Sequence, residues 1–166
     1  MGRINAIFAA DIRGGMGNKG TMPWPHKSDD LAWFKEHTEG QIVIMGRRTW
    51  DDPAMPKPLP NRISCIFTNR FINMPSVYCL KGDYTKQVLK VQAEFPNRNI
   101  FIIGGSALLE ETRPLVERVY FTLIRDSFKT DCRININAYL QGLKCESVKP
   151  GDGCTFSIYK NETIPQ

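Results

Sequence analysis

Short apolar runs that alternate with helix-like segments constrain this chain more than any other feature. Five runs rich in isoleucine, valine, phenylalanine and alanine are bounded by polar residues, glycine or proline, as buried strands are. These predicted strands span residues 4–10, 42–45, 63–68, 100–103 and 119–124. Predicted helices span residues 28–38, 84–95 and 106–112, and a further short helix is expected after Gly46. Strands that alternate with helices are typical of an α/β fold with a mainly parallel sheet.

The C-terminal tail departs from this alternation. It is poor in helical periodicity and offers two weaker strand candidates, residues 145–148 and 155–160. Consecutive strands without a crossover helix pair in antiparallel fashion. We therefore expect an α/β fold with a mixed, mainly parallel sheet, an antiparallel C-terminal edge and flanking helices. A chain of 166 residues is most simply one domain, which would span residues 1–166.

The net charge of +5 suggests anionic partners. Basic residues are scattered along the chain rather than gathered in a tract, so we expect no nucleic acid among those partners. No apolar run approaches the roughly 18 residues that cross a bilayer, and no basic and apolar leader opens the chain. We expect a cytoplasmic monomer with no membrane association.

Cysteine usage argues against a metal centre or a disulfide framework. The five cysteines are odd in number and contain no C-x-x-C pair. The histidines that could join them as metal ligands are His26 and His37. We therefore expect no metal site and reduced thiols.

Glycines mark three places where the backbone has special freedom. Gly14, Gly15, Gly17 and Gly20 follow the first strand and predict a mobile loop, either a lid over a site or a disordered surface turn. Gly46 and the pair Gly104-Gly105 each end a strand just before a helix. Backbone N–H groups at such a junction can approach a phosphate, although the G-x-G-x-x-G fingerprint of the Rossmann fold is absent there.

Five motifs in a fixed order carry a family resemblance. The first is residues 5–10, followed by Gly15-x-Gly17-x-x-Gly20-x-Met22-Pro23-Trp24-Pro25 and Asp30; the others are residues 43–50, 58–62, 102–107 and 119–122. Together they resemble the dihydrofolate reductases. The resemblance implies reduction of dihydrofolate to tetrahydrofolate by NADPH, with a hydride to C6 and a proton to N5 of the pterin.

The resemblance also implies catalytic roles. Asp30 would be the acid that promotes protonation, Trp24 would lie beside the water that carries the proton, and Thr122 would bond to Asp30 or to the pterin. The residues alone leave two alternatives open. Asp29 could equally be the inward carboxylate, and either acid could simply favour the positive end of the helix dipole. The family spacing selects Asp30.

Substrate contacts follow from the same resemblance. Apolar walls for the pterin and benzoyl rings would come from Leu31, Phe34, Leu59 and Ile103, and the backbone of Ile7 would contact the pterin. Arg62 would hold the glutamate carboxylate of the substrate, because a planar guanidinium binds carboxylates in a bidentate pair. Otherwise Arg62 would be a solvated loop arginine.

Cofactor contacts are implied for a larger set at the strand ends. The set is Ala9, Met16, Gly46, Arg47, Arg48, Thr49, Thr68, Asn69, Arg70, Gly104, Gly105, Ser106 and Ala107. Arg47 and Arg70 fall where the family binds the adenosine 2′-phosphate, which favours NADPH over NADH. Ala107 and Leu109 replace an arginine and a tyrosine found in many bacterial members, so we expect altered cofactor contacts.

Two other functions compete with this interpretation. A pyrimidine reductase of riboflavin synthesis would use NADPH on the same fold with a ribityl substrate. A binding or assembly protein would keep folate and NADPH with weak or no catalysis.

Overall fold

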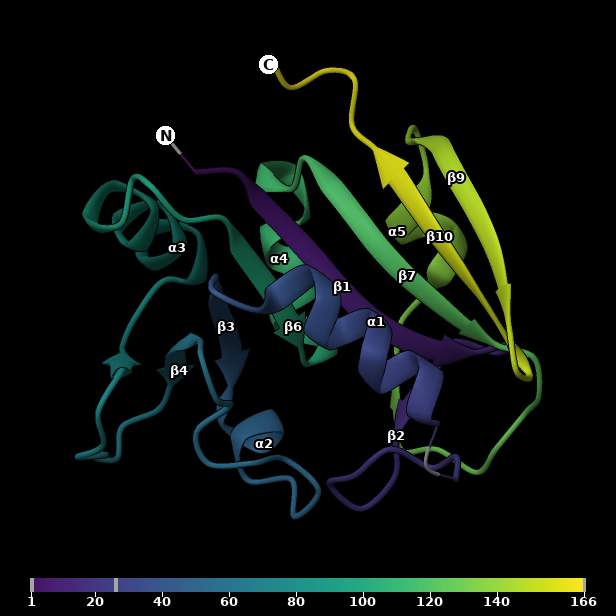
Figure 1. Cartoon of the computed structure of the whole chain (residues 1–166), viewed down its shortest axis with the longest axis horizontal. Helices are drawn as coiled ribbons and strands as arrows, with labels where there is room; N and C mark the ends of the chain where they lie inside the picture. The colour runs from purple at the N-terminus through teal and green to yellow at the C-terminus, as the bar shows by residue number, and fades with distance from the viewer. Residues whose placement is uncertain (1, 26, 166) are drawn as a thin grey trace.

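The structure is a computed structural model that describes residues 2–25 and 27–165, so the candidate ligand His26 lies outside the described residues (Figure 1). Within these residues, eight strands form one sheet in the order β5-β4-β3-β6-β1-β7-β10-β9. The strands are β1 Ile4–Asp11, β3 Ile42–Gly46, β4 Ile63–Phe67, β5 Val77–Leu80, β6 Ile100–Gly104, β7 Arg118–Ile124, β9 Lys144–Gly151 and β10 Cys154–Lys160. All neighbours from β5 to β7 are parallel, whereas β10 is antiparallel to both β7 and β9. The expected fold class is confirmed.

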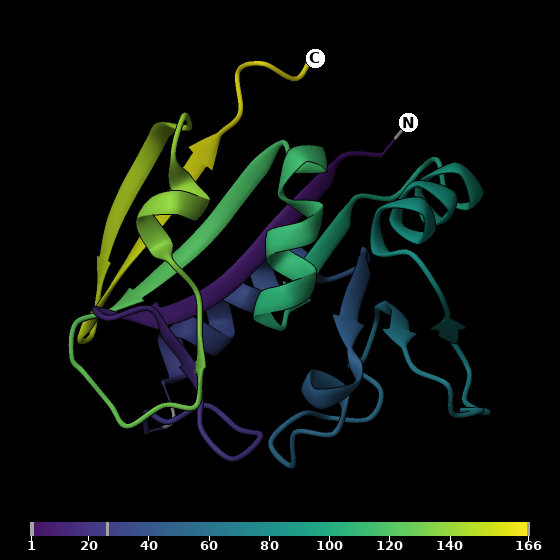
Figure 2. The same cartoon turned by 180° about the vertical axis from the view of Figure 1, so that it is seen from behind.

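Helices cover both faces of the sheet. Helix α1, Ser28–Thr38, lies across one face (Figure 1), and α3, α4 and α5 lie on the other (Figure 2). The remaining helices are α2 Arg47–Trp50, α3 Tyr84–Glu94, α4 Ser106–Thr112, the 3-10 turn η1 Arg113–Leu115 and α5 Ile136–Leu140. None of the helices in the described part of the chain is long and apolar enough to span a bilayer.

The sheet separates two apolar cores. Successive side chains of a strand point to opposite faces, so Ile42 and Ile44 of β3 enter the core beneath α3 and α4, while Val43 and Met45 enter the core beneath α1. Burial on both faces explains why the central strands read as continuous apolar runs.

Four elements were not predicted from the sequence: β5, η1, α5 and a small two-stranded ribbon. The ribbon pairs β2, Gly15–Gly17, with β8, Cys132–Arg133, in antiparallel fashion. The glycine-rich loop was therefore only partly a loop. A Cβ atom on Gly15 would lie 2.4 Å from Thr130 Cγ2 and 2.7 Å from Asp11 Oδ2, so close packing requires glycine at this position.

Candidate active site

A cavity of about 570 Å³ lies where the parallel strands end. Its lining includes Ala9 of β1, Gly46 at the end of β3, Gly104 at the end of β6 and Thr122 of β7, with Asp30 contributed by α1. The volume lies within the range of small-molecule sites, and the carboxyl ends of parallel strands are the usual place for them in open α/β sheets. This cavity is the candidate active site.

Asp30 is the carboxyl group that α1 directs into the cavity. Thr122 donates a hydrogen bond of 2.7 Å from Oγ1 to Oδ1 of Asp30. Burial raises the pKa of Asp30 above its ordinary value, while the Thr122 hydrogen bond partly opposes the shift and the negative charge of Asp29 adds to it. The cavity therefore holds one carboxyl group that stays protonated to higher pH than an exposed aspartate.

Asp29 points elsewhere, which resolves the alternative left open by the sequence. Its Oδ2 accepts a hydrogen bond of 2.8 Å from the backbone N–H of Asp152, in the turn between β9 and β10. The Cys154 thiol lies 3.8 Å from the same oxygen. Asp29 thus fastens the start of α1 to the antiparallel edge of the sheet, outside the cavity lining.

The predicted apolar walls all line the cavity. Ile7 and Leu59 are buried, and Phe34 and Ile103 are half-buried. Leu31 is 44% exposed and lies at the rim. These side chains give the cavity a largely apolar lining around Asp30, an arrangement suited to flat, weakly polar rings.

Two strand-to-helix junctions meet on the other side of the cavity. Gly46, Arg47, Arg48 and Thr49 form one junction, and the residues Gly104 to Ala107 form the second. The two junctions are in van der Waals contact, since a Cβ on Gly46 would lie 3.8 Å from the Gly104 carbonyl oxygen. Gly104 has φ +132°, a conformation that favours glycine, and its peptide bond to Gly105 is cis.

Five predicted site residues do not line the cavity itself: Trp24, Arg62, Thr68, Asn69 and Arg70. The buried Trp24 ring lies 6.2 Å from the ring of Phe128. Arg70 donates a hydrogen bond of 2.6 Å to Asp51, and its backbone N–H bonds to Thr68 Oγ1. The roles proposed for these residues therefore remain predictions.

Arg62 lies next to one side chain of the apolar wall of the cavity. Its Nε donates a hydrogen bond of 2.9 Å to the Pro60 carbonyl oxygen. Its guanidinium carbon lies 5.9 Å from the centre of the Phe34 ring. These two contacts fix the guanidinium next to a side chain that does line the cavity.

The lining also includes residues that the sequence did not single out. Cys132 of the ribbon lies 3.7 Å from Ser106 Oγ, and Tyr84 stacks edge-on against Phe67 with ring centres 4.8 Å apart. Leu108 lines the cavity, whereas Leu109 is fully buried in the core. The signal that could have identified Phe67 and Tyr84 as lining residues is their position, since Phe67 ends β4 and Tyr84 begins α3.

The ribbon that carries Met16 and Cys132 is anchored by a buried carboxylate. Asp11, at the end of β1, is fully buried. Its Oδ1 accepts hydrogen bonds from the backbone N–H groups of Arg13, at 2.9 Å, and Gly15, at 2.8 Å. Its Oδ2 accepts a third from Phe128 at 3.0 Å. One side chain thus positions the start of β2 beside the cavity.

Comparison with known proteins gives a consistent result. The sequence model of the dihydrofolate reductase family matches residues 3–145. The dihydrofolate reductase of Bacillus subtilis is 34% identical over 77% of this chain and 73% of its own length. The type 8 dihydrofolate reductase of Escherichia coli is 23% identical over 98% of both chains. A dihydrofolate reductase from Enterococcus faecalis, solved in complex with NADP(H) and RAB-propyl, superposes with a TM-score of 0.79 at 26% identity, over 95% of both chains. The chain therefore belongs to the dihydrofolate reductase family.

Proposed function

We propose that this chain reduces dihydrofolate to tetrahydrofolate with NADPH, with a hydride to C6 and a proton to N5 of the pterin. The observation that carries the proposal is the Asp30 carboxyl group, which lies in an apolar cavity with a raised pKa and a single side-chain hydrogen-bond donor, Thr122, among the described residues. Such a group can bond to a pterin ring and remain protonated closer to neutral pH. Membership of the family supports the same reaction.

The proposed cofactor contacts fit a dinucleotide. NADPH supplies the hydride when it is bound. The glycines at the ends of β3 and β6 leave backbone N–H groups unobstructed for its pyrophosphate. Arg47 and Arg48 are exposed beside this cradle, so their guanidinium groups can reach phosphates. Ala9, Met16 and Thr49 complete the lining proposed for the cofactor, with Ser106 and Ala107 at the start of α4.

Asp30 is the proposed acid. Its protonated carboxyl bonds to the pterin and promotes delivery of a proton to N5 through water, while Thr122 fixes the orientation of the carboxyl group. We assign Trp24 to the boundary of the space in which that water moves. The apolar walls exclude bulk water from the reacting atoms.

Arg62 is the proposed anchor for the glutamate carboxylate of the substrate. Its Nε is committed to Pro60, while its two terminal nitrogens make no hydrogen bond within the described residues. A guanidinium held in this way keeps two donors for a bidentate carboxylate. Thr68, Asn69 and Arg70 are the proposed contacts to the 2′-phosphate side of the cofactor.

The first test follows the loss of NADPH absorbance after dihydrofolate is added to the purified chain. The parent should turn over, and Asp30→Asn should lose about 10²–10⁴-fold in kcat/KM, the usual contribution of a positioned acid. Turnover of a ribityl pyrimidine without turnover of dihydrofolate would identify a pyrimidine reductase instead. Binding of both ligands without oxidation would identify a folate- and NADPH-binding protein.

We further propose that the chain acts as a cytoplasmic monomer without a nucleic acid partner. The scattered arrangement of its basic residues supports the absence of a nucleic acid surface. Sedimentation of the purified chain tests the monomer, and fractionation of cells tests the location. A salt-dependent affinity for DNA or RNA would contradict the last part of the proposal.

A further inference from the structure

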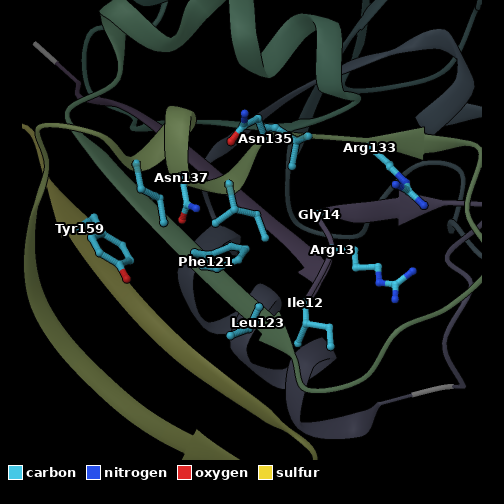
Figure 3. Close-up of a pocket in the computed structure, with 12 residues that line it drawn as sticks. Ile12, Arg13, Gly14, Phe121, Leu123, Arg133, Asn135, Asn137 and Tyr159 are labelled. Carbon is cyan, nitrogen blue, oxygen red and sulfur yellow. The ribbon is translucent and has the colours of Figure 1, made fainter.

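A second cavity, of about 660 Å³, is shown in Figure 3. It lies on the opposite face of the sheet from Asp30. Phe121 and Leu123 of β7 line it, whereas Thr122 between them faces Asp30. The rest of its lining comes from residues 12–14, which follow β1, from Tyr159 of β10 and from residues between 133 and 140, which include part of α5. Residues that are far apart in the sequence thus enclose a space that the proposed reaction does not use.

The lining of this second cavity combines apolar side chains with two positively charged arginines, and no acidic side chain is among its described residues. Phe121, Leu123 and Leu140 provide apolar surface. Arg13 and Arg133 lie on one side of Phe121 and Tyr159 lies on the other (Figure 3). None of the twelve described lining residues is acidic. The arginine side of the cavity therefore favours an anion.

Several polar groups around the cavity are available for a ligand. Within the described part of the chain, the guanidinium of Arg13, the amide of Asn137 and the hydroxyl of Tyr159 take part in no hydrogen bond or ion pair. Arg133 uses only Nε, which donates to Thr130 Oγ1 at 3.1 Å. Asp11, the nearest acid in sequence to Arg13, has its carboxylate occupied by three backbone N–H groups. Two exposed guanidinium groups consequently keep free donors at the edge of the apolar hollow, and both extend away from Phe121 in Figure 3.

We propose that this cavity is a second ligand site, which takes a small amphipathic aromatic anion. The ring body would pack on Phe121, and a carboxylate, sulfonate or phosphate would bond to Arg13 and Arg133 once their exposed side chains turn toward the hollow. The volume lies within the range of about 300–1,000 Å³ that is usual for small-molecule sites. Apolar surface and positive charge in the lining of one hollow select a ligand that carries both an apolar body and an anion.

The experiment saturates the Asp30 cavity of the full chain with folate and NADP⁺, then titrates the chain with anilinonaphthalene sulfonate and follows the fluorescence of the probe. The parent should bind the probe, and the double variant Arg13→Gln with Arg133→Gln should bind it at least tenfold more weakly. Asn137→Trp should also weaken binding at least tenfold, because Asn137 is exposed and a tryptophan there would fill the hollow without disturbing the core. Thermal melts show that each variant is folded.

Matched controls separate binding at this site from nonspecific binding of the probe. The double variant Lys86→Gln with Lys90→Gln removes the same charge from the exposed side of α3 and should leave affinity unchanged. Replacing both arginines with lysine should retain part of the affinity. Uncharged phenylnaphthylamine, which has the same rings, should bind at least tenfold more weakly than the sulfonate. Equal affinity of the parent and the arginine-to-glutamine variant, or equal affinity for the charged and uncharged probes, would overturn the proposal.

Discussion

The hydroxyl of Thr122 donates a hydrogen bond of 2.7 Å to the carboxylate of Asp30, across 92 positions of sequence. The bond joins α1 to β7 and fixes one face of the carboxyl group. Burial raises the pKa of Asp30 and the Thr122 hydrogen bond limits that rise. The pH range of the proposed reaction therefore depends on both the cavity and this one hydroxyl.

Removing that hydroxyl should shift the pH profile in a defined direction. Thr122→Val loses the bond that lowers the pKa of Asp30, so the pKa rises further and the alkaline decline of kcat/KM moves to higher pH. Stability should fall by about 1 kcal/mol. The measurement is kcat/KM for dihydrofolate across pH. Thr122→Ser keeps the hydroxyl and should keep the parent profile, and a valine variant with that same profile would show that the bond does not tune Asp30.

The raised pKa of Asp30 also predicts that its ionised form destabilises the fold at neutral pH. A carboxyl whose folded-state pKa lies above its unfolded-state pKa stabilises the fold fully below the unfolded value, and this contribution is lost as pH rises through the folded value. Asp30→Asn should therefore increase the free energy of unfolding at neutral pH, by about 1 kcal/mol. The gain should vanish in acid.

Urea unfolding at neutral and acid pH measures this effect. Asp29→Asn is the matched control, because Asp29 is adjacent on α1 but its carboxylate accepts a hydrogen bond from the backbone of Asp152. The control should not gain stability at neutral pH. A neutral-pH gain shared by both variants would point to the charge of the helix start rather than to burial of Asp30.

Cofactor preference should depend on Arg47. Arg47→Gln removes a proposed contact to the 2′-phosphate of NADPH. Because a hydrogen bond to a charged group contributes about 1.5–3 kcal/mol, KM for NADPH should rise by roughly 10- to 100-fold. KM for NADH should not change, because NADH lacks that phosphate. Steady-state kinetics with both cofactors measure the ratio. Lys81→Gln, at another exposed cation, should leave the ratio unchanged.

Asp11 should be essential for stability rather than for chemistry. Asp11→Ala leaves three backbone N–H groups without their acceptor, and we expect a loss of about 3 kcal/mol in the free energy of unfolding. Asp126→Ala, at a nearby exposed acid, should cost well under 1 kcal/mol. Urea unfolding compares the two. Equal stability of the two variants would show that Asp11 does not anchor the ribbon.

The sequence predicted best those features that depend on a single strand or helix. The central strands are buried on both faces, so their apolar runs were plain, and the helix at residues 28–38 has the observed bounds. Strand β5 was missed because it is a short edge strand whose Tyr78 is half-exposed, which leaves no clear run or alternation. The ribbon was missed because Gly15 and Gly17 carry no strand signal.

Relationships between distant segments could not be predicted in the same way. The residues alone left Asp29 and Asp30 as alternatives, and the partners that separate them, Asp152 and Thr122, lie more than ninety positions away. The second cavity was not foreseen because its lining comes from segments as distant as Arg13 and Tyr159, and no local pattern records that they meet.

The ribbon and the residues next to it contribute to the lining of both cavities, at the edge of the sheet that separates them. Met16 and Cys132 line the cavity that holds Asp30. Gly14, two positions before Met16, and Arg133, next to Cys132, line the second cavity. The backbone of Gly14 packs closely against that of Ile134, since a Cβ on Gly14 would lie 2.0 Å from the Ile134 carbonyl oxygen. A ligand in one cavity that displaced these residues would therefore change the lining of the other cavity as well. By thermodynamic linkage, the ligands of the two cavities would then change each other's affinity by the same factor.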